Sequence, residues 1–271
     1  MMLQKEIIIN ALKSNGFENV EATTVVKNGI EMEAINYRPE GSNIGVNAYL
    51  ADYRTEAEAI DNMTKLFSKP IPNFSIDSVN YSQLTARIYE NGNAGTDLVR
   101  PFNDLEICLA VRLGNDEEGE SSFKLTKNLL NHYGLDEEEA FKVALENCHK
   151  ESETHHVNKL LSKLSGMNEE HLNQMFGQLP MWILTNNRQV FGAIEITNTE
   201  ALSDLAEFVG DDLWILPSSI HEIIAVPVSL GEPEGLRMTV GEVNQTEVKA
   251  EEVLSETVYR FNRDSKTVTI A

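Results

Sequence analysis

Polar side chains with catalytic potential gather between two apolar runs near residue 220. They supply hydroxyls at Ser218 and Ser219, an imidazole at His221 and a carboxylate at Glu222. A histidine can act as general base for a serine, so a hydrolase-like enzyme is one interpretation. The Gly-x-Ser-x-Gly pattern of a nucleophile elbow is absent, and adjacent residues on a strand point to opposite faces, which separates His221 from Glu222. The alternative is a structural or binding turn that leads into the next strand.

A second group of side chains has metal-binding chemistry. Cys148, His149, His155 and His156 lie within nine residues of one another. On a continuous helix, residues seven apart share a face, but they are roughly 10 Å apart along the axis, too far for one tetrahedral zinc. A break in the helix near residues 152–154 would bring the ligands together. Without it, these histidines belong to a polar, solvated helix end.

Other residues that could bind an ion occur in less specific patterns. Asp211, Asp212 and the run 137–139 are acidic, but no D-x-D-x-D-G loop accompanies them, so a solvated face or a helix start is favoured. The glycine-rich nucleotide loops are also missing, and we expect no cofactor. Trp182 and Trp214 occupy matching positions in apolar runs and are expected in the core.

Charge and composition narrow the classes of partner. The 271 residues include 43 acidic and 22 basic side chains, for a net charge of −21. Nucleic acid and anionic membranes require clustered lysine and arginine, so neither is an expected partner. No apolar run approaches the 18 or so residues of a membrane span, and the first residues lack a signal-peptide pattern. With only Cys108 and Cys148 as thiols, a cytoplasmic location is expected.

The first hundred residues are predicted to form an N-terminal lobe of both helices and strands. Leu3, Ile7, Ile8 and Leu12 recur at helical spacing, which predicts a helix over 2–15. The Asn28-Gly29 pair favours a type I′ turn, because both central residues of that turn need positive φ. It predicts strands at 20–27 and 30–37, and a further strand is expected near 44–53. Thr55 is expected to cap the following helix, with Glu58 as its capping-box partner.

The remaining residues, 101–271, are predicted to form a second α+β domain. A strand at 105–113 and a helical excursion over 136–177 precede its central unit. Residues 181–230 then predict a β-β-α-β-β unit, with strands at 181–186 and 190–196, a helix capped by Asn198 or Thr199, and strands at 212–219 and 222–230. A helix and a terminal hairpin follow. The predicted fold class is therefore α+β, with antiparallel sheets and helices packed on them.

Three separated segments carry a family resemblance. They read LTNNRQVFGAIEI, GDDLWILPSSIHEIIAVP and EVNQTEVKAEEVLSETVYRFNRD, and they follow FNDLEICLAVRL in the same chain. Their order resembles a family of uncharacterised bacterial proteins, domain of unknown function 5688, over roughly residues 100–271. That family has no established activity or catalytic residues to transfer. The resemblance implies an accessory protein of the cytoplasm, associated with mobile elements.

These observations favour a non-enzymatic binding or protein-interaction module whose partner is an unidentified protein or small molecule. The absence of a nucleotide loop, of a strong metal-ligand set and of a triad pattern supports this interpretation. The alternative is a hydrolase-like enzyme using the region Ser218 to Glu222, and a metal-binding regulator is a third hypothesis.

Overall fold

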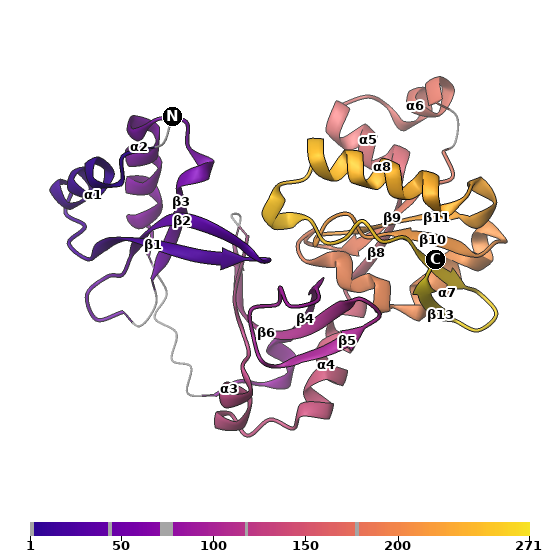
Figure 1. Ribbon diagram of the computed structural model, residues 1–271, viewed down its shortest axis with the longest axis horizontal. Coiled ribbons are helices and arrows are strands. Elements are labelled where there is room, and N and C mark those ends of the chain that lie inside the picture. The colour runs from indigo at the N-terminus through magenta and orange to yellow at the C-terminus, as the bar shows by residue number, and fades with distance from the viewer. Residues whose placement is uncertain (1–2, 43–44, 71–77, 117–118, 177–178) are drawn as a thin grey trace. The chain divides into compact units, whose positions relative to one another are not determined.

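The computed structural model describes residues 3–42, 45–70, 78–116, 119–176 and 179–271, and it has the predicted α+β fold. Its sheets are antiparallel, and helices pack on them (Figure 1). The chain divides into unit 1, Met1–Ser78, and unit 2, Val79–Ala271. The boundary predicted near residue 100 instead lies within a strand of unit 2, Val99–Phe102.

Unit 1 contains a three-stranded sheet and two helices. Its elements are α1 (Lys5–Ser14), β1 (Val20–Lys27), β2 (Ile30–Tyr37), β3 (Val46–Tyr49), η1 (Leu50–Asp52) and α2 (Glu56–Phe67). Asn28 and Gly29 have φ angles of 46° and 76°, so the hairpin turn has the positive φ that the sequence predicted. Thr55 caps α2 by accepting from the Glu58 N–H, whereas the Glu58 carboxylate accepts from the Arg54 N–H rather than from the cap residue.

Unit 2 contains the two larger sheets. Its elements before the centre are η2 (Tyr81–Gln83), β4 (Leu84–Glu90), β5 (Val99–Phe102), β6 (Leu105–Asp116), β7 (Gly119–Lys124), α3 (Lys127–His132), α4 (Glu137–His149), β8 (Ser152–His156), α5 (Val157–Ser165) and α6 (Glu169–Phe176). The following elements are β9 (Trp182–Asn186), η3 (Gly192–Thr197), α7 (Thr199–Val209), β10 (Leu213–Leu216), β11 (Ile223–Pro227), η4 (Val228–Leu230), α8 (Pro233–Thr246), η5 (Ala250–Glu252), β12 (Tyr259–Asn262) and β13 (Thr267–Ile270).

The four-stranded sheet is centred on β6, which pairs with β4, β5 and β7. Helix α4 packs against β4. Its Asn147 side chain donates to the carbonyl oxygens of Tyr81 and Leu84, and its Cys148 sulfur accepts from the Ala86 N–H. The Leu84 and Ala86 groups belong to β4, which is an edge strand, and the Tyr81 carbonyl belongs to η2 just before it, so the helix protects this edge of the sheet.

The six-stranded sheet has the order β13-β12-β10-β11-β9-β8. Helix α8 lies over one face and α7 lies on the other (Figure 1). On the α8 side, Val240 packs in a cluster with Trp214 and Leu216 of β10 and Val226 of β11. On the α7 side, Leu202, Leu205 and Ala206 are buried. The terminal hairpin of β12 and β13 turns at Asp264-Ser265, as predicted.

The second strand predicted in the central unit is wrong. Residues 190–196 do not pair with β9, and most of them form the 3-10 helix η3. Phe191 has φ of 55°, in the left-handed region, which turns the chain out of an extended path. Every residue from Gly192 to Ile196 is buried, whereas a strand with one exposed face would alternate. The partners of β9 are instead β8 and β11.

The predicted helical excursion over 136–177 is interrupted by a strand. Asp136 caps α4 as its composition indicated, accepting from the Glu139 N–H. After α4, residues Ser152–His156 form β8 and pair antiparallel with β9. Helices α5 and α6 follow this strand. The continuous segment from α4 to β8 therefore covers the edge of the four-stranded sheet and then provides an edge strand of the six-stranded sheet.

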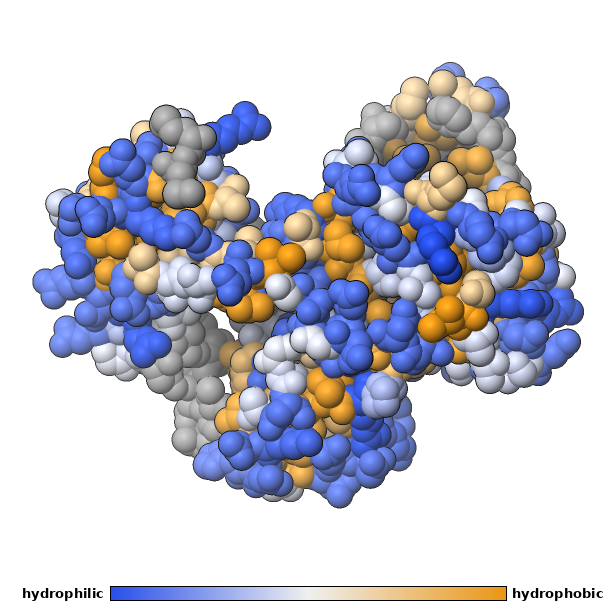
Figure 2. Space-filling model, viewed as in Figure 1, coloured by the Kyte–Doolittle hydropathy of each residue, from blue (hydrophilic) through white to orange (hydrophobic). Residues whose placement is uncertain are grey.

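The visible face of the protein is mainly hydrophilic, with apolar side chains scattered in small areas (Figure 2). This is consistent with the excess of acidic residues in the sequence. In the described part of the chain, no helix combines the length and apolar character that a membrane span requires.

Candidate functional site

A pocket of about 690 Å³ opens in unit 2 between strands β8 and β9, the end of α4 and the start of α7. Its volume falls in the range of roughly 300–1,000 Å³ that is common for small-molecule sites. Polar, acidic and aromatic side chains from four segments line it: His149, Ser152, Thr154, His156, Trp182, Thr197, Asn198, Thr199, Glu200, Ala201, Asp204, Leu205 and Phe208.

Strand pairing aligns one wall of the pocket. Alternate residues of a strand share a face, so Ser152, Thr154 and His156 of β8 point the same way. His156 lies opposite Trp182 of β9 in the register, which places both on the α7 side of the sheet. Their rings meet edge to face, with centroids 5.6 Å apart. The wall is therefore held by backbone pairing rather than by a mobile loop.

The first turns of α7 provide the opposite wall. Asn198 caps the helix by accepting from the Ala201 N–H at 3.1 Å. Glu200 and Asp204 are four residues apart, so their carboxylates follow one side of the helix. Phe208 continues that side, and its ring meets Trp182 edge to face at 6.2 Å. Although it is a large aromatic residue, Phe208 is 78% exposed.

His149 is held at the inner end of the pocket. Its Nε2 lies 3.0 Å from the Thr197 hydroxyl, and that hydroxyl donates its single hydrogen to the Ile194 carbonyl. Thr197 must therefore accept from His149, which requires a proton on Nε2. Burial lowers the pKa of His149, an effect that the nearby Glu200 carboxylate only partly offsets. The imidazole is consequently neutral near pH 7.

Glu195 lies directly behind the pocket and is fully buried. Its Oε2 accepts a 2.7 Å hydrogen bond from the Asn198 amide. Burial raises the pKa of this carboxyl to about 7, against the opposing effect of the Asn198 and Ser152 side chains. Because Asn198 and Ser152 both line the pocket, the carboxyl contacts its inner wall without facing its opening.

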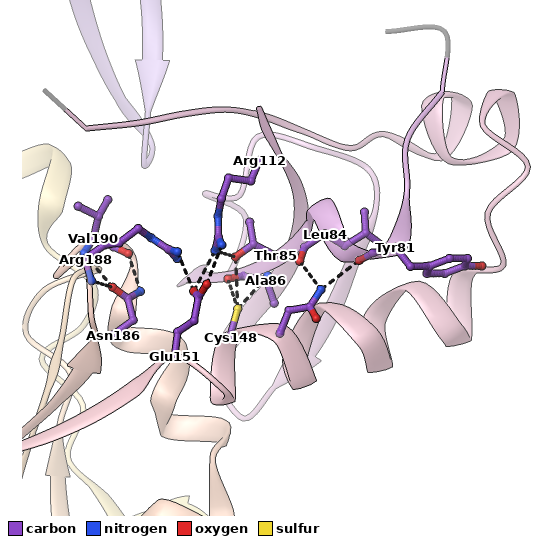
Figure 3. Close-up of polar contacts among 11 residues, drawn as sticks. Tyr81, Leu84, Thr85, Ala86, Arg112, Cys148, Glu151, Asn186, Arg188 and Val190 are labelled. Atoms are coloured by element: carbon purple, nitrogen blue, oxygen red, sulfur yellow. Dashed lines mark hydrogen bonds and ion pairs between the residues drawn. The ribbon is translucent and has the colours of Figure 1, made fainter. Parts of the chain in front are cut away.

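A chain of charged and polar contacts joins the two sheets of unit 2 beside the pocket (Figure 3). Glu151, between α4 and β8, receives both terminal nitrogens of Arg112 at 3.0 and 3.2 Å. The same carboxylate lies 2.7 Å from Arg188, which follows β9. Arg112 also reaches Thr85 of β4 at 3.5 Å, and Thr85 contacts the Cys148 sulfur at 3.3 Å. This network fixes the end of α4, and with it His149.

Both cysteines are structural. Cys108 and Cys148 are buried free thiols. Burial raises the pKa of Cys108 to about 11 and also raises the pKa of Cys148. A thiol must ionise to act as a nucleophile or metal ligand, so burial keeps both groups unreactive.

The predicted catalytic group lies in the connection between β10 and β11. Ser218 and Ser219 are buried, and their backbones pair with the segment around Val253. The Ser219 hydroxyl accepts from the backbone N–H of His221 rather than from its ring. Burial raises the pKa of Glu222, and the nearby His221 and a hydrogen bond with Ser219 oppose that effect.

The His221 ring has other neighbours. Its Nδ1 accepts from the Phe191 N–H at 3.2 Å, and its Nε2 lies 3.8 Å from the Glu252 carboxylate. The fold thus brings His221 near the Glu252 carboxylate, and the predicted Glu222 also interacts electrostatically with His221. Neither Ser218 nor Ser219 is hydrogen-bonded to the imidazole.

The four predicted metal ligands go to different surroundings. His149 and His156 both line the pocket, on either side of the break between α4 and β8. Cys148 instead contacts β4, and His155 pairs with Glu153 at 2.7 Å on the opposite face of β8. Within the described residues, no group of three or more histidine, cysteine or acidic side chains is arranged to hold a metal.

Sequence reasoning did not identify the acidic and aromatic walls of the pocket. The sequence predicts Trp182 and Trp214 in the core, but only Trp214 is buried, at 7% exposed, whereas Trp182 is partly exposed. Helical geometry contains a signal for Phe208. Leu202, Leu205 and Ala206 share one face of α7, whereas a residue six positions after Leu202 lies roughly 120° away from it. An aromatic residue off the apolar face of a helix is a candidate for contact with a ligand.

A second hollow of about 610 Å³ lies between the β4–β6 region and the C-terminal segment of unit 2. Its Asp104 carboxylate accepts from the Thr257 hydroxyl at 2.8 Å and from Tyr259. These internal bonds occupy its central acid, and no aromatic ring lines it. The pocket beside α7 offers more groups for a ligand.

Comparison with known proteins identifies a family. No curated protein and no solved structure matches the chain. A family of unknown function, DUF5688, matches residues 96–263, which include every residue that lines the pocket beside α7. The chain therefore belongs to the DUF5688 family.

Proposed function

We propose that this protein is a cytoplasmic, non-enzymatic interaction module that binds its partner through the pocket beside α7. The exposed ring of Phe208, at the rim of a pocket with rigid walls, is the observation that carries this proposal. Exposed aromatic residues beside a concave site are typical of binding surfaces, because they bury much area at little cost in side-chain entropy. Strands β8 and β9 and the capped start of α7 provide the rigid support that specific binding needs.

The hydrolase alternative receives less support from the geometry. The imidazole of His221 has the Glu252 carboxylate within 3.8 Å, yet the Ser219 hydroxyl is hydrogen-bonded to the His221 backbone N–H and to Glu222 rather than to the imidazole. A general base must reach the proton that it removes, at roughly 2.6–3.2 Å or through one water.

An accessory role with a mobile element remains part of the proposal, and it rests on the family resemblance alone.

Selection from a random peptide library tests the interaction role. Peptides selected on the wild-type protein should bind Phe208→Ala at least tenfold more weakly in calorimetry. Glu207→Gln is the matched control, because Glu207 is an exposed residue on the same helix that does not line the pocket. Its affinity for the selected peptides should equal that of the wild type.

Two results would contradict the proposal. One is a set of selected peptides that bind Phe208→Ala as tightly as the wild type, which would place the interaction elsewhere. The other is ester or peptide hydrolysis by the wild type that His221→Ala and Ser219→Ala both abolish while circular dichroism shows them folded. That result would favour the enzyme.

A further inference from the structure

We propose that the pocket beside α7 binds an organic cation, the ammonium or guanidinium group of a lysine or arginine side chain on a protein partner. This inference rests on the proposed interaction role and adds the chemical class of the ligand. Two carboxylates and two aromatic rings in the lining of one pocket carry it together.

The formal charge of the lining is negative. Glu200 and Asp204 are exposed acids on one side of α7, and neither arginine nor lysine lines the pocket. In the described part of the chain, neither carboxylate forms a hydrogen bond or ion pair with another side chain. Both carboxylates are therefore available to a cation from outside. A bound cation would form a charge-assisted hydrogen bond with at least one of them.

The two histidines do not reverse this charge. His149 donates through Nε2 to Thr197, and its burial favours the neutral form. His156 accepts the Asn158 N–H on its Nδ1 at 3.2 Å, so that nitrogen is engaged within the protein. The acidic character of the lining therefore comes from its two carboxylates.

The aromatic side chains favour the same ligand class. Trp182 meets Phe208 at an interplanar angle of 82°, and Phe208 remains largely exposed. A cation above an aromatic face is attracted by the negative charge of the ring face, and more strongly where water is excluded. The chain already uses this interaction internally, because the Arg87 guanidinium lies 3.7 Å from the Phe191 ring centroid.

The helix dipole at the start of α7 disfavours a cation, whereas the two carboxylates favour one. The sizes of the charges show which effect is larger. A helix N-terminus resembles roughly half a positive charge, which favours anions. Asn198 already occupies the Ala201 N–H, and Glu200 stands in the first turn. Two full negative charges within the pocket outweigh half a positive charge of similar proximity.

The position of Phe208 favours a side chain on a protein over a free metabolite. Its ring is exposed at the rim, so a ligand that fills only the pocket would leave much of this apolar surface in water. A polypeptide can insert one basic side chain and cover the rim with its neighbours. The net charge of −21 would also attract a basic segment before contact.

Calorimetry with defined probes tests the ligand class. The probes are two blocked decapeptides, one centred on arginine and one centred on lysine, each with neutral flanks, together with the same peptide carrying glutamate at its centre. A free triamine is the fourth probe. The basic peptides should bind the wild type, the glutamate peptide should bind at least tenfold more weakly, and the triamine should bind more weakly than either basic peptide.

Pocket variants then locate the binding. Asp204→Asn and Glu200→Gln should each weaken the basic peptides about two- to fivefold, and the double variant about tenfold or more. Phe208→Ala should weaken them about three- to thirtyfold. Glu207→Gln, with the same loss of charge outside the pocket, should leave the affinity within twofold.

Each other result overturns a stated part of the inference. Equal or tighter binding of the glutamate peptide, or unchanged binding by the double variant, would exclude a cationic ligand. If that binding still disappears in Phe208→Ala, the interaction role survives without the ligand class. Triamine binding that matches the peptides would assign the pocket to a free cation. No binding of any probe would refute the ligand class, and the library selection would judge the interaction role separately.

Discussion

The side-chain amide of Asn198 connects the buried Glu195 carboxyl to the first turn of α7. Its nitrogen donates to Glu195 at 2.7 Å, and its oxygen accepts from the Ala201 N–H at 3.1 Å. One residue thus serves as helix cap and as partner of a buried acid. The proton on Glu195 is consequently coupled to the geometry of the pocket wall.

Protonation of Glu195 should make stability depend on pH. Burial raises the pKa of this carboxyl from 4.5 to about 7, so the folded protein holds a proton that the unfolded chain has released. Its contribution is fully present below pH 4.5 and is lost as pH rises through 7. At pH 8 the buried charge should lower the free energy of unfolding by about 2–3 kcal/mol. Glu195→Gln, which has no charge, should therefore be more stable than the wild type at pH 8 and similar at pH 5.

Urea unfolding of both proteins at the two pH values measures this difference. Glu222 also has a raised pKa, but it titrates in the wild type and in the variant alike, so its effect cancels. An equal stability difference at pH 5 and pH 8 would contradict the assigned role of Glu195.

Loss of the Glu151 carboxylate should destabilise unit 2. Glu151 binds Arg112 with both of its oxygens and also pairs with Arg188, and all three side chains are largely buried. Glu151→Gln would leave two buried guanidinium groups without their shared anion, which should lower stability by about 2–3 kcal/mol. Thermal and urea unfolding would measure the loss. Glu153→Gln is the control, because its more exposed pair with His155 should contribute under about 1 kcal/mol.

Gly192 should tolerate no side chain. A Cβ at this position would lie 2.3 Å from the Thr185 hydroxyl and 2.5 Å from the His221 carbonyl oxygen. Gly192→Ala should therefore destabilise the protein by about 2–3 kcal/mol. Gly235→Ala in α8 meets nothing within 4 Å and should stabilise the helix by about 0.5–1 kcal/mol. Urea midpoints that move in the same direction for both variants would contradict the packing described for η3.

The two thiols should react slowly in the folded protein. Both are buried, and the pKa of Cys108 is raised to about 11. At pH 8 a thiol of that pKa is about one-thousandth ionised, compared with roughly a quarter for a free cysteine. A disulfide reagent should therefore label neither residue on the timescale on which it labels both in urea. Rapid labelling of one thiol in native buffer would show that its surroundings open readily.

Local rules were sufficient for much of the fold. The Asn28-Gly29 turn, the Asn198 cap and the Asp136 cap each depend on residues within a few positions of one another. The failure at residues 190–196 has a physical cause. A short apolar run can fill a core as a strand or as a buried helix, and the choice here depends on Phe191 adopting positive φ.

The pocket required information that single segments do not contain. Its walls come from residues near 150, from Trp182 and from α7, and pairing of β8 with β9 is what brings them together. A break near residues 152–154 follows from the spacing of the candidate metal ligands, and the structure does place His149 and His156 in one pocket. The ligand class of the pocket depends on Glu200 and Asp204. No local sequence pattern connects these two acids to the histidines.

The contact between α4 and β4 limits how far the chain can be truncated while the pocket stays intact. β4 ends before residue 96, where the family match begins, yet its Ala86 backbone is what the Cys148 thiol covers. A fragment cut at 96 and 263 would expose that face of α4 and would also discard β13. Residues 79–271 keep both sheets complete. A graft of the pocket into another protein must therefore be longer than the segment by which the family is recognised.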